Sequence, residues 1–169
     1  MASFGDFLAG IFKTGAHSNV LTIVSPLNGK IVPLDKVKDE AFSSGTLGKG
    51  VAIIPDDGHL VSPLNGKVDM VIDSKHAIAL ISDNGIEILV HIGMDTVTLK
   101  GSGFTPAVAE GDVVKIGTPL IDFDIPAIQA AGFSLETPLV IVNSDAFTEI
   151  TATKAEHVKQ GDILLTLKK

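Results

Sequence analysis

Two histidines, His76 and His91, are the residues of this sequence best suited to chemistry near neutral pH. Imidazole has a reference pKa of about 6.5 and serves as a nucleophile, a proton carrier or a metal ligand. The string that runs from His76 to His91 is rich in Ile, Leu, Val and Ala and has Asn84-Gly85 near its middle. Asn-Gly between apolar runs favours a two-residue type I′ turn, because both residues of that turn need positive φ. The string therefore predicts a β-hairpin that brings the two histidines together.

The predicted turn sets the register of this hairpin and pairs Ile78 with His91. Side chains then alternate between two faces. The face expected to point into the core collects Ala77, Ala79, Ile81, Ile86, Ile88 and Val90, with Asp83 beside the turn. The other face collects His76, Ile78, Leu80, Ser82, Glu87, Leu89 and His91. The histidines would be diagonal neighbours on an outward apolar face, with their Cα atoms roughly 7–8 Å apart. This predicts a binding surface, while the alternative is a pair of ordinary surface histidines.

The elements that must position this hairpin are mostly strands. From about residue 20, short runs rich in Val, Ile and Leu alternate with Gly, Pro, Asn and Asp. One seven-residue string occurs at 24–30 and again at 61–67, each time with an Asn-Gly that is expected to form a hairpin. Residues 110–113 and 160–163 form a weaker echo. The sequence predicts an all-β, antiparallel β-sandwich or flattened barrel with pseudo-symmetric hairpin repeats.

Helix is expected to be scarce. Residues 126–131, with Asp124 as cap, and residues 155–159 are each predicted to form one short turn. Residues 1–18 differ from the rest, because their apolar side chains follow the spacing of an amphipathic helix. The alternative is a flexible tail. We expect two parts, a flexible or amphipathic segment over 1–18 and a single domain over 19–169.

Composition narrows the classes of function. The chain has 169 residues and a formal net charge of −7, which disfavours nucleic acid and leaves at most peripheral membrane contact, through residues 1–18. It contains no cysteine, so disulfides and thiolate chemistry are excluded. No apolar run approaches the roughly 20 residues that span a bilayer. These features agree with a cytoplasmic protein.

Two strings carry a resemblance to a known family: residues 74–77, Ser-Lys-His-Ala, and residues 90–101, which begin Val-His-Ile-Gly-Met-Asp-Thr-Val. They are similar to the glucose-family enzyme IIA of the bacterial phosphoenolpyruvate-dependent sugar phosphotransferase system. The likeness extends over nearly the whole chain from about Leu21 and includes the Pro-Leu-x-Gly turns and Gly-Asp-x-Val near residue 111.

The resemblance implies a phosphoryl carrier. His91 would accept the phosphoryl group from the histidine phosphocarrier protein, and a cysteine of a IIB domain of the sugar permease would receive it. His76 would contact the phosphoryl oxygens, and Ser74 stands where the family usually has a threonine in the same hydrogen-bond network. The partner-binding rim would contain Asp39, Phe42, Leu47, Ile72, Ile78, Leu89 and Asp95. Members of this family also signal by binding transporters and metabolic enzymes, which adds a regulatory role.

Two competing functions follow from the same residues. His91 and Asp95 have the His-x-x-x-Asp spacing of lysostaphin-type zinc endopeptidases, but the His-x-His pair of those enzymes is missing. His76 and His91 would supply only half of a tetrahedral zinc site, so zinc would need a ligand from a partner; no cofactor is required otherwise. A biotinyl- or lipoyl-type carrier needs a lysine at a hairpin tip, and the surroundings of Lys67 do not fit one.

Overall fold

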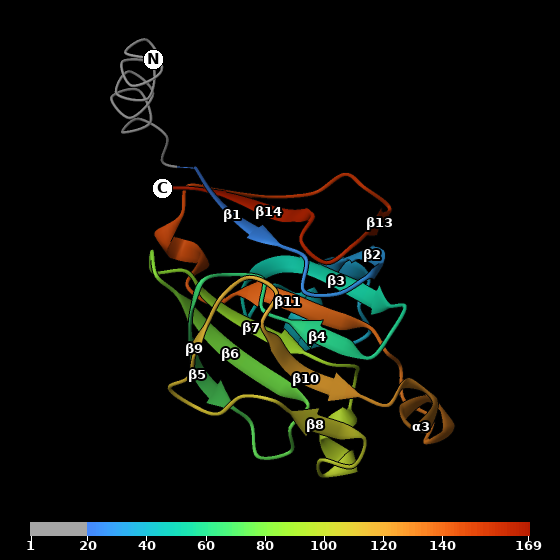
Figure 1. The fold of residues 1–169 in the computed structure, drawn as a ribbon. Coiled ribbons are helices and arrows are strands. Elements are labelled where there is room, and N and C mark those ends of the chain that lie inside the picture. Colours follow the sequence, from blue (N-terminus) through green and yellow to red (C-terminus); the bar gives the residue numbers. More distant parts are fainter. Residues whose placement is uncertain (1–19) are drawn as a thin grey trace.

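The computed structural model describes residues 20–169, and the predicted N-terminal segment, residues 1–18, lies outside the described residues. Every pairing between the described strands is antiparallel. The predicted all-β sandwich is confirmed, and the described strands form open sheets and not a closed barrel (Figure 1).

One sheet has eight strands and two smaller sheets have three strands each. In spatial order, the large sheet contains β13 (His157–Val158), β2 (Gly29–Pro33), β3 (Lys49–Pro55), β11 (Thr137–Ile141), β7 (Glu87–His91), β6 (Ala77–Ser82), β5 (Gly66–Val71) and β9 (Val113–Val114). The small sheets contain β1 (Val20–Val24), β14 (Ile163–Lys168) and β12 (Glu149–Ala152), and β4 (His59–Val61), β10 (Pro119–Phe123) and β8 (Phe104–Pro106). The main core draws side chains from all three sheets.

The predicted pseudo-symmetry relates two halves of the molecule. Strands β13, β2, β3 and β11 correspond to β9, β5, β6 and β7, and the sheet β1-β14-β12 corresponds to β4-β10-β8. The repeated strings at 24–30 and 61–67 hold equivalent places and bind each other: Val24 N–H donates to Pro63 O at 3.2 Å, and Val61 N–H to Pro26 O at 3.0 Å. The strings therefore lie side by side.

The Asn-Gly turns inside these two strings do not close hairpins, which corrects the prediction. Strands β1 and β2, which flank Asn28-Gly29, belong to different sheets, and so do β4 and β5. Each glycine begins a strand where the neighbouring strand comes very close. A Cβ on Gly29 would lie 2.2 Å from Ile54 O, and a Cβ on Gly66 would lie 2.0 Å from Ile81 O. Glycine is thus needed for close approach of two strands, and not for a hairpin turn.

The weaker echo does not mark symmetry. Gly161 N–H donates to Ser25 O, and the equivalent bond in the other half runs from Gly117 to Ser62 O. The counterpart of Gly161 is therefore Gly117 and not Gly111. The likeness of 110–113 to 160–163 reflects similar turn chemistry: Asp112 and Asp162 each accept a bond from the backbone three residues earlier.

The hairpin of β6 and β7 forms, but its register differs from the predicted one by one residue. Ala77 pairs with His91 and Ile78 with Val90. The loop has three residues, because Gly85 N–H donates to Ser82 O, Ser82 N–H donates to Ile86 O, and Gly85 has φ +87°. The Ser82 hydroxyl accepts a bond from Ile86 N–H at 2.8 Å, which stabilises this longer loop. A type I turn followed by a left-handed glycine is the usual three-residue hairpin loop.

This register exchanges the predicted faces of β6, while the predicted faces of β7 are confirmed. Ile78 and Leu80 point into the core, together with Ile86, Ile88 and Val90. Ile81 and Ala79 are half-buried on the outer face, where Leu89 and His91 also lie. The prediction that Ile78 and Leu80 surround the histidines on an outward face is therefore wrong.

The helices are short. Helix α3 (Ile125–Ala130) confirms the predicted turn, and Asp124 caps it by accepting a bond from Ala127 N–H at 3.0 Å. The other helical elements within residues 20–169 are helix α2 (Glu40–Ser43) and the 3₁₀ turns η1 (Leu34–Lys36), η2 (Thr96–Leu99) and η3 (Ser144–Ala146). The helical turn predicted for 155–159 is wrong, since strand β13 lies there. Within residues 20–169, no helix has the length and apolar character that crossing a membrane requires.

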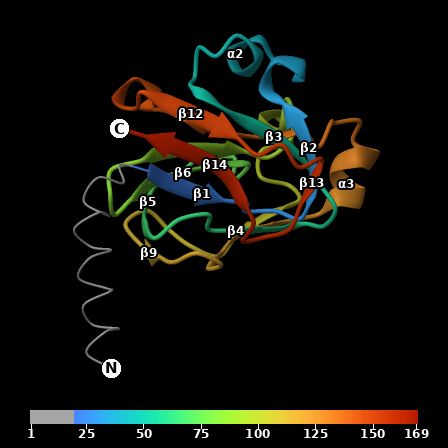
Figure 2. The same cartoon turned by 90° about the horizontal axis from the view of Figure 1, so that it is seen from above.

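The connection from β2 to β3 covers part of the outer face of the large sheet (Figure 2). Val37 and Phe42 from this connection pack on Ala52 and Val140 of the sheet and on Met94. This small second core places the ring of Phe42 next to His91.

Candidate functional site

The two histidines meet at the end of β7, as predicted, although by a different route. Their ring centroids lie 4.6 Å apart and the ring planes are inclined by 80°. His91 is the last residue of β7. His76 comes just before β6, so its side chain does not have to follow the alternation of side chains between the two faces of that strand. Lys75, with φ +62°, turns the chain just before His76. Ile92 N–H then donates to His76 O at 2.7 Å and joins the two segments.

His91 is half-buried and held by the backbone that follows it. Its Nδ1 lies 2.7 Å from the carbonyl oxygen of Gly93. A carbonyl oxygen only accepts hydrogen bonds, so the proton of a neutral His91 ring resides on Nδ1 and Nε2 keeps its lone pair. Gly93 adopts φ +73°, and a Cβ there would lie 2.7 Å from Ser134 O, so only glycine fits.

His76 is almost fully buried, with 3% of its surface exposed. Its Nδ1 lies 2.8 Å from Ser74 Oγ, which is the bond expected of the residue at that position. On its other side the ring meets Phe104 edge-on, with 6.4 Å between centroids. His91 likewise meets Phe42, at 5.2 Å. The pair of imidazoles therefore has one phenyl ring beside His91 and another beside His76.

This environment favours neutral imidazoles. Burial lowers the pKa of His76 from 6.5 to about 4, with a further contribution from the nearby charge of His91 and some opposition from Ser74. Burial also lowers the pKa of His91 below its ordinary value, opposed by the hydrogen bond to Gly93 and by the charges of Asp39 and Asp95. At pH 7 both rings are mainly uncharged.

Four of the rim residues named from the sequence lie close to His91: Asp39 and Asp95 act on it by charge, Phe42 meets its ring, and Leu89 packs on the same small core as Phe42. Asp39 caps α2 through a bond from Ala41 N–H at 2.9 Å and lines, with Met94 and Asp95, a cavity of about 210 Å³. Asp95 is exposed at φ +60°. Leu47 is exposed, and Ile72 and Leu89 are half-buried. Phe42 is buried and forms a wall of the site, whereas Ile78 is fully buried and is not a rim residue.

Two features of the site escaped sequence analysis. The first is the Gly93 carbonyl, which selects the tautomer of His91. The second is Phe104, whose place beside His76 depends on the packing of β8. The only local signal for Phe104 was a large apolar residue directly after the glycine-rich turn at 101–103.

The described residues do not form a complete metal site by themselves. Across residues 20–169, no group of three or more His, Cys, Asp or Glu side chains is placed to hold a metal ion. Zinc held by His76, His91 and a partner's ligand stays a prediction.

A family model matches residues 21–147, and its description is the phosphoenolpyruvate-dependent sugar phosphotransferase system, EIIA 1. The chain belongs to this EIIA family. The match spans both histidines and most of the described strands. The resemblance noted from residues 74–77 and 90–101 is thereby confirmed.

Two relatives of this EIIA chain differ in how much of their own length it matches. A glucose-specific EIIA component from Oceanobacillus iheyensis is 43% identical over 142 residues, covering 84% of this chain and 86% of the relative. A β-glucoside-specific EIIBCA component from Bacillus subtilis is 44% identical over 159 residues, covering 94% of this chain. The chain spans about a quarter of that relative, 26% of its length.

A solved structure shares the fold of this EIIA chain. The glucose permease IIA from Mycoplasma capricolum superimposes with a TM-score of 0.82 and is 35% identical in sequence. The match covers 88% of this chain and 96% of that one. The chain is thus a glucose-type EIIA component and a phosphoryl carrier of a sugar phosphotransferase system, and nothing in these likenesses supports a zinc hydrolase.

Proposed function

We propose that the chain accepts a phosphoryl group on Nε2 of His91 from the histidine phosphocarrier protein and passes it to a cysteine of a IIB domain. The bond between His91 Nδ1 and Gly93 O, at 2.7 Å, is the observation that carries the proposal. It leaves the lone pair of Nε2 available, which is what a nucleophile needs. The lowered pKa of His91 keeps that lone pair unprotonated at pH 7.

Each of the two transfers exchanges one bond to phosphorus. In the first, Nε2 of His91 attacks phosphorus while the N–P bond of the donor phosphohistidine breaks. In the second, the Nε2–P bond breaks as the cysteine sulfur of the IIB domain forms an S–P bond. Such transfers depend mainly on in-line positioning and on stabilising the charge of the equatorial oxygens.

His76 is suited to stabilise those oxygens. When Ser74 Oγ donates to Nδ1 of His76, the proton of the neutral ring resides on Nε2. An N–H of this kind donates a hydrogen bond to a phosphoryl oxygen without adding a full positive charge. We therefore assign Ser74 the role of orienting His76, and His76 the role of binding the transferred group.

The surroundings of His91 suit basic protein partners. Asp39 and Asp95 raise the pKa of His91 through their charge, so both carboxylates act on this site. Together with the net charge of −7 of the whole chain, these carboxylates would speed encounter with a basic surface. The EIIBCA relatives carry their EIIA in a longer chain, which supports a IIB or IIBC sugar permease as the acceptor. We place the reaction in the cytoplasm and assign any regulatory binding to the same face.

Reconstitution with phosphoenolpyruvate, enzyme I and the histidine phosphocarrier protein tests the proposal. Wild-type chain should gain one acid-labile phosphate, located on His91 by mass spectrometry. His91→Ala should gain none, and a phosphohistidine retained in that variant would reject the assignment. His157→Ala is the matched control, because His157 is exposed and paired with Asp56. His76→Gln should mainly slow onward transfer to the IIB cysteine, and an equal loss of both transfers would contradict separate roles.

A further inference from the structure

The imidazoles of the site belong to a row of four rings in successive contact. Phe42 meets His91, His91 meets His76, and His76 meets Phe104. The two contacts with phenylalanine have centroid distances of 5.2 and 6.4 Å and inclinations of 61° and 64°. Edge-to-face contacts within 4.5–7 Å are the favoured geometry of ring pairs. The two phenyl rings thus flank the histidine pair at its opposite ends.

Phe104 reaches His76 from another layer of the molecule. It begins β8 in the three-stranded sheet, whereas His76 belongs to the turn before β6 of the large sheet. Phe104 is 4% exposed and pairs across the strands with Phe123 of β10. Asp124 N–H donates to Gly103 O at 2.9 Å and ties down the residue that precedes Phe104. The ring therefore has a supported position.

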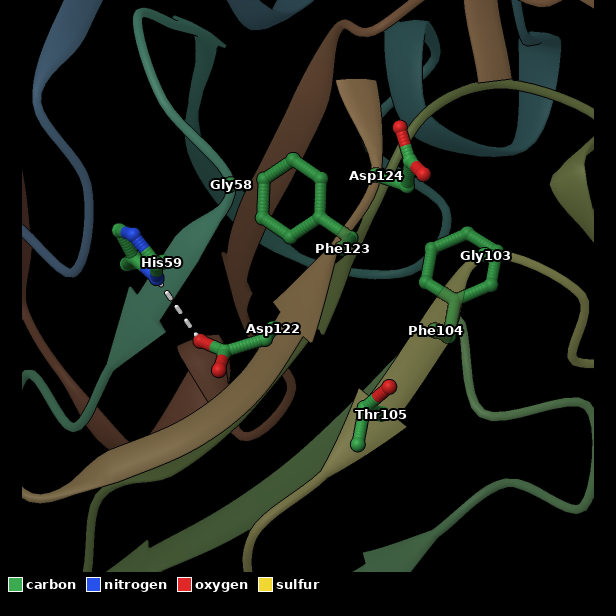
Figure 3. A pocket seen from close by; sticks show the side chains of 8 residues that line it. All are labelled: Gly58, His59, Gly103, Phe104, Thr105, Asp122, Phe123 and Asp124. Carbon is green, nitrogen blue, oxygen red and sulfur yellow. Dashed lines mark hydrogen bonds and ion pairs between the residues drawn. The ribbon is translucent and has the colours of Figure 1, made fainter. Parts of the chain in front are cut away.

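Phe104 also borders an open cavity of about 310 Å³, shown in Figure 3. The cavity is lined by Gly58, His59, Gly103, Phe104, Thr105, Asp122, Phe123 and Asp124, and His76 is not among them. Its rim is polar, since His59 and Asp122 form a pair at 2.9 Å whose side chains are 69% and 63% exposed. The ring of Phe104 thus contacts the buried imidazole and also borders a polar, solvent-accessible hollow.

We infer that Phe104 is a positioning residue for phosphoryl transfer: its ring holds the imidazole of His76 edge-on to His91 and keeps the water of the cavity away from it. The inference rests on the proposed function, because it concerns the group that would bind the transferred phosphoryl. It is nevertheless measurable without any partner protein, through the titration of His76. The titratable group whose charge acts on His76 is His91, and Ser74 and Phe104 also contact its ring.

The test uses two substitutions in the full chain. Phe104→Ala admits water to His76, and Phe104→Leu keeps apolar volume but loses the ring. In both variants the pKa of His76, followed by NMR of its ring protons, should rise from about 4 toward 6.5, and more so in the alanine variant. Onward transfer to the IIB cysteine should fall on the order of tenfold, since misplaced groups lose rate steeply. Phosphorylation of His91 by the donor should change much less.

Phe123→Leu is the matched control. Phe123 is similarly buried, at 6% exposure, and lines the same cavity, but within residues 20–169 the phenylalanine in ring contact with His76 is Phe104. The Phe123→Leu control should lose about as much stability as Phe104→Leu and should leave the titration of His76 unchanged. An unchanged titration in folded Phe104→Leu, or an equal shift in Phe123→Leu, would overturn the inference. If wild-type chain transfers no phosphate but the predicted titration shift is seen, the proposed function fails, and what stands is that Phe104 holds the imidazole of His76 and shields it from water.

Discussion

The two pseudo-symmetric halves share one architecture but differ at the two positions that carry the histidines of the candidate site. Ala77 pairs with His91 in one half as Gly50 pairs with Val140 in the other. The residues before these strand positions are His76 and Lys49. Where one half has two imidazoles, the other therefore has an exposed lysine and a buried valine. The shared fold does not by itself determine a function, and the residues of the candidate site occur in one half only.

The halves also differ in what connects equivalent strands. The connection from β5 to β6 covers only residues 72–76, and it ends in His76. The connection from β2 to β3 covers residues 34–48 and includes η1 and α2. This longer segment buries Val140 under Val37 and Phe42, and the same Phe42 reaches His91. The half that lacks His76 and His91 thus supplies a wall for the half that carries them.

The largest effect is expected from removing that wall. Phe42→Ala should destabilise the protein by roughly 3–5 kcal/mol, because it deletes a buried ring and leaves a cavity. It should also expose His91, so the lowered pKa of His91 should return toward its ordinary value. Chemical denaturation and NMR titration measure the two effects. Phe42→Leu should restore most of the stability without the ring contact, and a free energy of unfolding unchanged by the alanine variant would contradict the role of α2.

The second effect concerns the pH dependence of stability. Because the folded pKa of His76 is about 4 and its ordinary value is 6.5, the unfolded chain binds a proton in this range that the folded chain does not. This contribution to stability is fully present above pH 6.5 and is lost as pH falls through about 4. The loss should amount to roughly 3 kcal/mol, measured by denaturation at a series of pH values.

His76→Gln removes that titration and should make the fall in stability between pH 6.5 and 4 shallower, while the lowered pKa of His91 still contributes a loss of the same sign. His59→Gln should leave it in place, because the bond to Asp122 raises the pKa of His59 and gives its contribution the opposite sign. A profile of His76→Gln that falls as steeply as that of the wild type would show that other groups cause the acid loss. The comparison thus separates a buried histidine from an exposed one.

A third effect tests whether the halves are equivalent away from the site. A Cβ on Gly29 or on Gly66 would meet a carbonyl oxygen at 2.2 and 2.0 Å, so each alanine variant forces the strands apart. We expect a loss of roughly 3 kcal/mol in each, similar for both. Gly85→Ala is the control, because Gly85 has φ +87° and a Cβ there would meet no atom within 4 Å, so this variant should lose only roughly 1 kcal/mol. Clearly unequal losses at Gly29 and Gly66 would break the equivalence.

The sequence alone predicted the strands, the pseudo-symmetry and the meeting of His76 with His91. It did not predict the register of the β6–β7 hairpin, because a two-residue and a three-residue loop share the same Asn-Gly signal. The Ser82 hydroxyl, which bonds Ile86 N–H, helps to hold the longer loop. The histidines still meet because His76 precedes the strand and does not follow its alternation. The alternation of side chains thus predicted the right pair of histidines, although it assigned the side chains of β6 to the wrong faces.

Other features depend on contacts that local sequence does not encode. Asn28-Gly29 has the composition of a hairpin turn, yet it carries the chain from one sheet to another, a choice made by packing of the two repeats. Phe104 lies beside His76 only because β8 pairs with β10 in a separate sheet. The family resemblance predicted His91 as the nucleophile but gave no reason for its tautomer, which comes from the Gly93 carbonyl.

The smallest effect concerns how neighbouring carboxylates change the pKa of His91, at the site, and of the exposed His59. Asp39 raises the pKa of His91 more than Asp95 does. Asn also caps helices, so Asp39→Asn should keep α2 and remove only the charge. The pKa of His91 should then fall further below its ordinary value, and Asp95→Asn should lower it by less. Asp122→Asn should instead lower the pKa of His59, because Asp122 is the main cause of its raised value.

NMR titration of the ring protons of His59 and His91 in these three variants shows whether each carboxylate acts only on the histidine beside it. Each carboxylate should act on the histidine nearest to it, so Asp39→Asn should leave His59 unchanged and Asp122→Asn should leave His91 unchanged. If Asp122→Asn moved both histidines equally, the effect would come from net charge acting over the whole surface. Local action, by contrast, would mean that the acidic residues of the histidine-bearing site tune His91 directly, while the pair at His59 has no part in that tuning.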